Sequence, residues 1–348
     1  MTMKSIARVV WNRRVLAVAG VLAVLATSAC SQSGNSSSST SGAAAGGNGK
    51  AKIFVIGGKS DDPFWSKVKR GVDDAAKVVQ AQGGSVTFLG PQNYDNLGPD
   101  AAKLIDSTLS QGATAVIAPD WVPDAEDAAL KHVTDQKVPL FIYNAGGLPA
   151  ADKVGAVNYV GSEEYTAGKA GGTYLGQHSA KHSLCVNTLP GSTNTEDRCR
   201  GIGDGIKANG GTSTELPLPS SQFGNQTAVA QAIKAALLKD SSIDSVVTIS
   251  TSDAGSAVSA VQQANLTGKV KPATFDMDTA TLNNIKNGTT LFAIDQQPYM
   301  QGYLSVSMAN SYVAYGINLP QRPILTGPAI IDSQNVDQAL AGEQAGVR

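Results

Sequence analysis

The sequence predicts an α/β protein with two lobes, each a parallel β-sheet with helices on both faces. From Lys52 onward, apolar runs of four to seven residues alternate with amphipathic segments. The alternation restarts after Val160–Gly161 with a similar rhythm, and 348 residues are enough for two sizeable cores. Short apolar runs are typical of strands buried on both faces, so the repeated strand–helix units indicate parallel sheets with right-handed crossovers.

The individual elements follow from these runs. We expect strands at residues 52–57, 85–90, 113–119, 139–144, 156–161, 183–188, 245–250 and 271–276. Helical patterns separate most of them, at residues 64–80, 101–111, 124–135, 165–178, 195–209, 228–240, 255–265 and 300–315. A single sheet would need an unusual number of strands, so two Rossmann-like lobes are favoured. Their predicted bounds are 51–160 plus 297–324 for the N-terminal lobe, and 161–296 plus 325–348 for the C-terminal lobe.

The first thirty residues precede the fold and have the pattern of an export signal. The apolar stretch at residues 15–26 is too short to cross a bilayer as a helix, and "ATSAC" follows it and ends at Cys30. This leader resembles a bacterial lipoprotein signal, in which the cysteine is lipidated, although Thr27 stands where that motif usually has Leu or Val. An ordinary secretory peptide is the alternative. The leader contains four basic residues: Lys4, Arg8, Arg13 and Arg14.

Residues 31–50 are rich in Ser, Gly and Ala and predict a flexible tether between a membrane anchor and the folded body. Removal of the leader takes away four positive charges and no negative ones, which changes the net charge from −1 to −5. The chain has no basic patch, which argues against a nucleic-acid partner, and we expect a monomer. Two cysteines remain, Cys185 and Cys199. A disulfide and two buried thiols are both compatible with their positions.

The sequence contains none of the familiar catalytic or metal-binding motifs. The glycines of "GIGDG" at 201–205 have the wrong spacing for a dinucleotide site, and "GKAGG" at 168–172 lacks the pattern of a phosphate loop. Ligands of open α/β sheets bind at the loops that follow the carboxyl ends of the strands. We therefore predict binding at these loops, without catalysis, cofactor or metal.

Five segments carry a resemblance to the type 1 periplasmic sugar-binding proteins, the ribose- and galactose-binding receptors of ABC importers. They are "SDDPFW" (60–65), "TEDRCRGIGDGI" (195–206), "STSDAGSAVSAV" (250–261), "ATFDMDTATLNNI" (273–285) and "FAIDQQPYMQGYL" (292–304). The resemblance implies two lobes joined by three hinge crossings, near Val160–Gly161, Ile294–Gln297 and Ile324–Gly327. It also implies an extracytoplasmic lipoprotein that captures a small sugar, alditol or cyclitol by closing its lobes and delivers it to an ABC permease.

The chemistry of a sugar explains the residue types in these segments. Aromatic rings stack on the apolar faces of a sugar ring, while carboxylates, amides and guanidinium groups bond its hydroxyls. We expect Phe64 to be the stacking floor and Arg200 and Asp276 to be the main polar contacts. Phe64 could instead only staple a helix, Asp276 could only cap one, and Arg200 could lie on the surface. The full predicted set is Asp61, Asp62, Phe64, Trp65, Trp121, Asn144, Arg198, Arg200, Phe223, Thr251, Asp253, Asp276 and Gln296.

Departures from the family pattern leave the ligand open. The fourth strand of the family usually ends in Asp-Arg, whereas this chain has Asn144 and Ala145. We therefore do not assign ribose or galactose, the ligands of the family, to this chain. A receptor that presents a bound sugar to a membrane sensor, without transport, would use the same site and is the alternative function. A hydrolase is disfavoured, because the adjacent carboxylates of Asp61 and Asp62 are a poor acid–base pair.

Overall fold

The computed structural model describes residues 50–348; the leader, Cys30 and residues 31–49 of the tether lie outside this range. All eight predicted strands and all eight predicted helices are present. The strands are β1 Lys52–Ile56, β2 Ser85–Leu89, β3 Ala115–Ala118, β4 Leu140–Tyr143, β5 Asn158–Gly161, β6 His182–Asn187, β7 Thr212–Pro217, β8 Ser245–Thr248, β9 Lys271–Phe275, β10 Ala293–Asp295, β11 Ile324–Leu325 and β12 Ala329–Ile331.

The described residues also contain one short 3-10 turn, Ser220–Gln222, and eleven α-helices. The helices are α1 Pro63–Ala81, α2 Leu97–Ser110, α3 Pro123–Asp135, α4 Gly147–Val154, α5 Glu164–Gln177, α6 Thr193–Lys207, α7 Gln226–Lys239, α8 Thr251–Gln263, α9 Thr279–Lys286, α10 Pro298–Tyr315 and α11 Val336–Gln344. None of them is both long and apolar enough to span a membrane.

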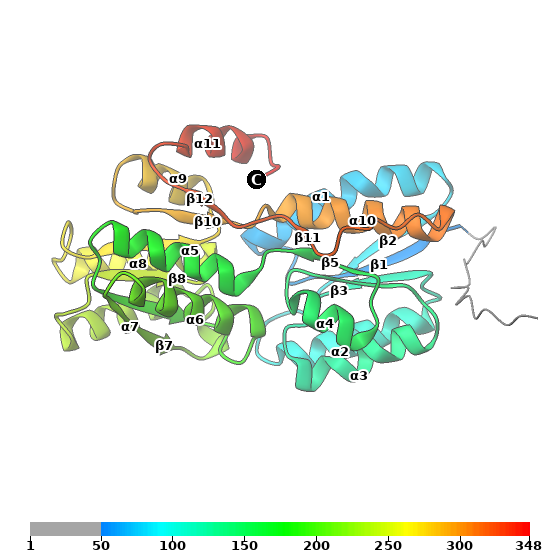
Figure 1. The fold of residues 1–348 in the computed structure, drawn as a ribbon, viewed down its shortest axis with the longest axis horizontal. Coiled ribbons are helices and arrows are strands. Elements are labelled where there is room, and N and C mark those ends of the chain that lie inside the picture. Colours follow the sequence, from blue (N-terminus) through cyan, green and yellow to red (C-terminus); the bar gives the residue numbers. More distant parts are fainter. Residues whose placement is uncertain (1–49) are drawn as a thin grey trace, which may run out of the picture. The chain divides into compact units, whose positions relative to one another are not determined.

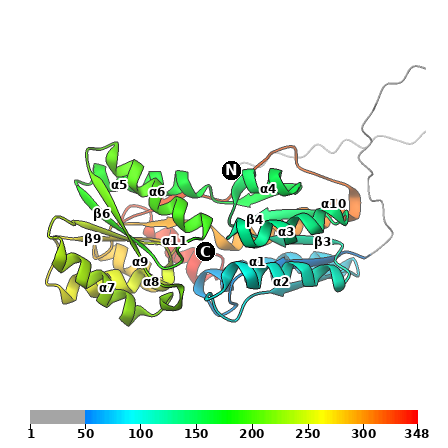
Figure 2. The same ribbon diagram turned by 90° about the horizontal axis from the view of Figure 1, so that it is seen from below.

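The strands form two six-stranded sheets, which confirms the predicted fold class (Figures 1 and 2). The first has the order β11-β5-β4-β3-β1-β2 and is parallel throughout. The second has the order β12-β10-β9-β8-β6-β7, and only its edge strand β12 is antiparallel. We call each sheet with its helices the N-terminal and C-terminal lobe; the residue bounds given above for the lobes stay a prediction.

The chain passes between the sheets three times: after β5, after β10 and between β11 and β12. Because of the second passage, α10 packs beside α1 in the N-terminal lobe although the two helices are far apart in sequence (Figure 1). After the third passage α11 packs against α9 in the C-terminal lobe (Figure 2). Each lobe is therefore completed by a segment that comes late in the chain.

The apolar runs become strands because both faces of each sheet are buried. In β1, Ile53 and Val55 pack toward α1 and α10, whereas Phe54 and Ile56 pack toward α2 and α3. A strand that alternates between two apolar environments needs apolar residues at every position, which produces a continuous run. Strand β7 was not predicted, because it is a largely exposed edge strand whose polar sequence, TSTELP, lacks an apolar run.

Glycines bring α5 and α6 close together. A Cβ at Gly168 would lie 2.3 Å from the backbone oxygen of Arg198, and one at Gly201 would lie 2.3 Å from the oxygen of Tyr165. The "GKAGG" and "GIGDG" segments therefore serve helix packing. This packing matters for function because α5 carries Glu164 and α6 carries Arg198, both described below.

Candidate ligand-binding site

A cavity lies where the carboxyl ends of the strands of the two lobes face one another. It contains about 530 Å³ of space that no protein atom fills, part of which is open to solvent. The N-terminal lobe supplies Asp62, Phe64, Trp65, Tyr94, Trp121 and Asn144. Gln296 lies on the second passage, and the C-terminal lobe supplies Leu189, Ser192, Asn194, Thr195, Arg198, Phe223, Ile249, Ser250, Thr251, Ser252 and Asp276.

The N-terminal wall is aromatic. Asp62 caps α1 by accepting hydrogen bonds from the backbone nitrogens of Phe64 (2.9 Å) and Trp65 (3.3 Å), which fixes both rings at the start of the helix. Trp65 packs edge-on against Phe64, Trp121 and Tyr143, with centroid separations of 5.2, 5.6 and 6.1 Å. Phe64 and Trp65 are both buried, with 9% and 7% of their surface exposed, and both line the cavity.

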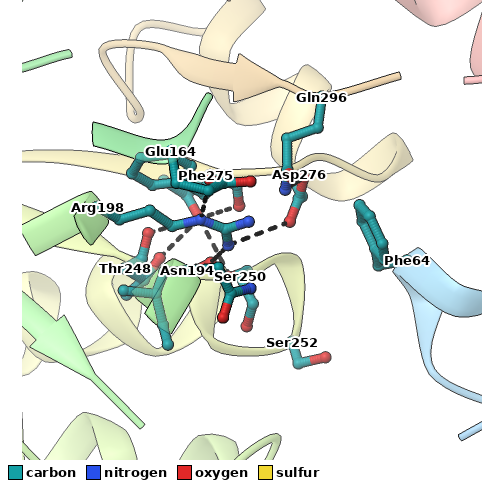
Figure 3. A network of polar contacts seen from close by, with 12 residues as sticks. Phe64, Glu164, Asn194, Arg198, Thr248, Ser250, Ser252, Phe275, Asp276 and Gln296 are labelled. Carbon is teal, nitrogen blue, oxygen red and sulfur yellow. Dashed lines mark hydrogen bonds and ion pairs between the residues drawn. The ribbon is translucent and has the colours of Figure 1, made fainter. Parts of the chain in front are cut away.

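The opposite wall is centred on the buried guanidinium of Arg198 (Figure 3). Its Nε donates to Glu164 at 2.7 Å and its Nη1 donates to the backbone oxygen of Ile249 at 2.7 Å. The same Nη1 lies 4.0 Å from the carboxylate of Asp276, and the guanidinium covers the ring of Phe275. In Figure 3, Arg198 extends toward Asp276, and Phe64 approaches from the other lobe.

Asn144 and Asp276 occupy matching places in the two lobes. Each follows one of the two central strands of its sheet, β4 or β9, and each has a left-handed backbone, with φ of 63° and 61°. Asn and Asp tolerate this conformation better than other non-glycine residues. Such strained residues cluster at binding sites, and here each places a polar side chain at the cavity.

Hydrogen bonds connect the site to the passages between the lobes. Gln296 donates to Asp276 at 2.7 Å, and its backbone oxygen accepts from Thr326 of the third passage at 2.7 Å. On the other side, Gln301 accepts from Asn144 at 3.2 Å and donates to the same Gln296 oxygen at 3.3 Å. The polar residues of both lobes are thus linked through one residue of the hinge.

The buried acids of the C-terminal wall are poorly solvated. Burial raises the pKa of Asp276 to about 7, against the opposing effects of Arg198 and Gln296. Burial also raises the pKa of Glu164, again against the effect of Arg198. A ligand hydroxyl that donates to Asp276 would favour its ionised form. The wall can therefore both accept hydrogen bonds, at Asp276, and donate them, at Arg198 and Gln296.

Three residues predicted for the site do not line the cavity. The side chain of Arg200 is 63% exposed, pairs with Asp197 at 2.6 Å and lies over Tyr165. Side chains two positions apart on an α-helix point about 200° away from each other, so Arg198 and Arg200 cannot face the same cavity. Asp61 is exposed beside Lys59, because the turn directs its neighbour Asp62 inward. The structure therefore contradicts the prediction that Arg200 and Asp61 line the ligand site.

Asp253 is the third correction. It is fully buried and accepts hydrogen bonds from Thr188 (2.5 Å), the backbone nitrogen of Gly224 (3.1 Å) and Ser250 (3.3 Å). Its carboxylate is used within the C-terminal lobe, where it joins the loops that follow β6, β7 and β8. The other ten predicted residues line the cavity, and their contact with a ligand stays a prediction.

Several lining residues were not singled out from the sequence. Tyr94 and Ser192 lie in loops that follow strands, and Asn194 and Thr195 lie in the first turn of α6, but their polar side chains had no distinguishing signal in the sequence. Asp278 caps α9 through the backbone nitrogen of Thr281 at 2.7 Å, so Asp276 is not needed as the cap. Cys185 of β6 and Cys199 of α6 form a disulfide, which ties the helix turn that carries Arg198 to its sheet.

Comparison with known proteins identifies the family. Residues 53–316 match the family described as "Periplasmic binding protein domain". The chain belongs to this family. The resemblance to the type 1 sugar-binding group is confirmed, and family membership indicates an extracytoplasmic location and binding without catalysis.

Named relatives support the same group. The chain is 23% identical over 301 residues to a xylose/arabinose-binding protein, XylF, of Sulfolobus acidocaldarius, covering 83% of this chain and 73% of the relative. A carbohydrate transporter structure from Acidothermus cellulolyticus, in complex with myo-inositol, is 28% identical with a TM-score of 0.77 and covers 86% of this chain and 99% of that one. A solute-binding protein from Agrobacterium vitis with bound D-fucose shares the fold, at 20% identity and a TM-score of 0.73, covering 84% and 99%.

Proposed function

We propose that this periplasmic binding protein captures a small, neutral, polyhydroxylated ligand and delivers it to an ABC permease. The observation that carries the proposal is the composition of the cavity: aromatic rings from one lobe face Arg198, Asp276 and Gln296 across it. Rings suit the apolar face of a sugar or cyclitol. A hydroxyl can donate to Asp276 and accept from Arg198, whereas an anion would meet Asp62 and Asp276 and a cation would meet Arg198.

The relatives favour a pentose, a deoxyhexose or a cyclitol. The ligands named for these relatives are xylose or arabinose, D-fucose and myo-inositol, all neutral ring compounds with several hydroxyls. The predicted alternative, a receptor that signals to a membrane sensor without transport, is not favoured by these relatives.

We also propose that the two lobes close around this ligand. Contacts between the lobes surround the cavity: the backbone nitrogen of Thr193 donates to the oxygen of Trp121 at 2.8 Å, and Lys67 pairs with Glu343 at 2.7 Å and donates to the oxygen of Met277 at 2.9 Å. These contacts hold the lobes together beside the cavity, and their separation would widen the way in for a ligand. Hinge motion at the three passages would open them.

A thermal-shift screen of residues 31–348 against pentoses, hexoses, alditols and cyclitols tests the function. A true ligand at a hundred times its dissociation constant should stabilise the fold by about 2.7 kcal/mol. The same ligand should reduce the radius of gyration in small-angle X-ray scattering. Stabilisation by charged amino acids or peptides instead of polyols would contradict the proposed ligand class, and an unchanged radius at saturation would contradict closure.

The membrane anchor is proposed from the leader, which lies outside the described residues. If Cys30 is lipidated, the full-length wild-type protein should fractionate with membranes, while Cys30→Ser should appear in the soluble fraction or the medium. Cys185→Ser with Cys199→Ser is the matched control, because those cysteines form an internal disulfide and should leave membrane attachment intact. Membrane attachment that survives Cys30→Ser would refute the anchor.

A further inference from the structure

A second, more open hollow adjoins the ligand cavity. It contains about 840 Å³ of unfilled space and is lined largely by polar residues, among them Lys59, Asp61 and Asp95. Four residues line both spaces: Asp62, Tyr94, Phe223 and Ser252. These four residues therefore separate the ligand cavity from the outer hollow, and we call them the partition.

Each half of the partition is a contact between the lobes. Tyr94 of the N-terminal lobe meets Phe223 of the C-terminal lobe edge-on, with ring centroids 5.0 Å apart at an interplanar angle of 81°. Beside them, Ser252 of the C-terminal lobe donates to Asp62 of the N-terminal lobe at 3.5 Å. The partition is complete only when the lobes are together, so it divides the two spaces in this closed arrangement.

The rings of Tyr94 and Phe223 are each positioned by residues of their own lobe. The hydroxyl of Tyr94 accepts from the backbone nitrogen of Lys59 at 3.1 Å, and Gly58 leaves room for it, since a Cβ there would lie 2.6 Å from that hydroxyl. On the other side, the residue after Phe223 is Gly224, whose φ of +74° favours glycine and whose nitrogen donates to the buried Asp253. The rings are thus positioned by their own lobes rather than by a bound molecule.

We propose that Tyr94 and Phe223 set an upper size limit and restrict this protein to ligands of a single ring. This inference rests on the proposed function and narrows its substrate class. The proposed monosaccharide or cyclitol would lie in the ligand cavity, on the inner side of the partition. A glycoside of the same ring would place its second ring across the partition, where it would separate the aromatic pair and prevent closure. Specificity then comes from steric exclusion in the closed state rather than from an additional attractive contact.

Calorimetry with matched pairs of ligands tests the limit: D-xylose with xylobiose, D-galactose with lactose, and myo-inositol with galactinol. The wild-type protein should bind the single ring of at least one pair and bind its glycoside weaker by about 10- to 200-fold or more. In Tyr94→Ala, Phe223→Ala and the double variant, the two affinities of that pair should converge to within a few-fold, as the opened partition admits the second ring to the outer hollow.

Phe64→Ala is the matched control, because Phe64 lines the ligand cavity but not the outer hollow. Phe64→Ala should weaken binding of the single-ring ligand, but the ratio of its affinity to that of the glycoside should stay as large as in the wild-type protein. Phe223 is only partly buried, so Phe223→Ala carries the test even if Tyr94→Ala lowers stability. An unchanged preference in Phe223→Ala, or a wild-type protein that binds glycoside and single ring equally, overturns the size limit alone. A wild-type protein that binds no single ring overturns the proposed function, and the limit with it.

Discussion

Arg198→Ala should abolish tight ligand binding and lower the free energy of unfolding by about 3–5 kcal/mol, the usual cost of removing one partner from a buried ion pair. The variant leaves the carboxylate of Glu164 buried without its 2.7 Å partner and removes the cation next to Asp276. A ligand hydroxyl in the closed site would also lose the guanidinium of Arg198 as its charged hydrogen-bond donor. We expect the ligand dissociation constant to rise by about a hundredfold or more.

Arg200→Ala is the control for this prediction. It removes the same charge two residues away, but the side chain of Arg200 is exposed, so stability should stay within about 0.5 kcal/mol of wild type and affinity should not change. Urea unfolding and calorimetry with the ligand found in the screen measure both quantities. Equal behaviour of the two variants would show that Arg198 is not the central polar residue of the site.

Trp65→Ala should lower the free energy of unfolding by about 3–5 kcal/mol, the range for truncating a buried tryptophan. Trp65 makes edge contacts with three aromatic rings that come from α1, the loop after β3 and strand β4. Its loss would leave a cavity between these segments, and the aromatic wall would lose its order. Ligand affinity should therefore fall as an indirect result.

Substitution of the neighbouring Phe64 distinguishes an effect on stability from an effect on ligand binding. Phe64 makes one such edge contact, with Trp65 itself, and lines the ligand cavity, so Phe64→Ala should cost less stability than Trp65→Ala. Loss of stacking should still raise the dissociation constant about tenfold, close to the value of one aromatic contact. Thermal unfolding with calorimetry measures both effects. A larger stability loss in Phe64→Ala than in Trp65→Ala would reverse the two assigned roles.

The outcome at each site residue depended on the kind of signal that the sequence carried. Strand-end positions are local, so the loops at Asp62, Asn144 and Asp276 could be located from apolar periodicity alone. Ser192, Asn194 and Thr195 of the C-terminal lobe were harder to identify, because a serine or asparagine after a strand has no pattern that distinguishes a cavity from solvent. Asp253 was misassigned for the same reason, since a carboxylate that joins three loops looks like one that meets a ligand.

The amino-acid sequence by itself determined the α/β class, the two-lobed order of strands and helices, and the chemistry of rings and charges at the strand ends. These properties follow from periodicity and residue type, which act over a few neighbouring residues. Only the tertiary structure decided which arginine faces the cavity, because the rotational position of α6 depends on its packing against α5. It alone paired Tyr94 with Phe223, since that contact forms between lobes whose surfaces no local pattern relates.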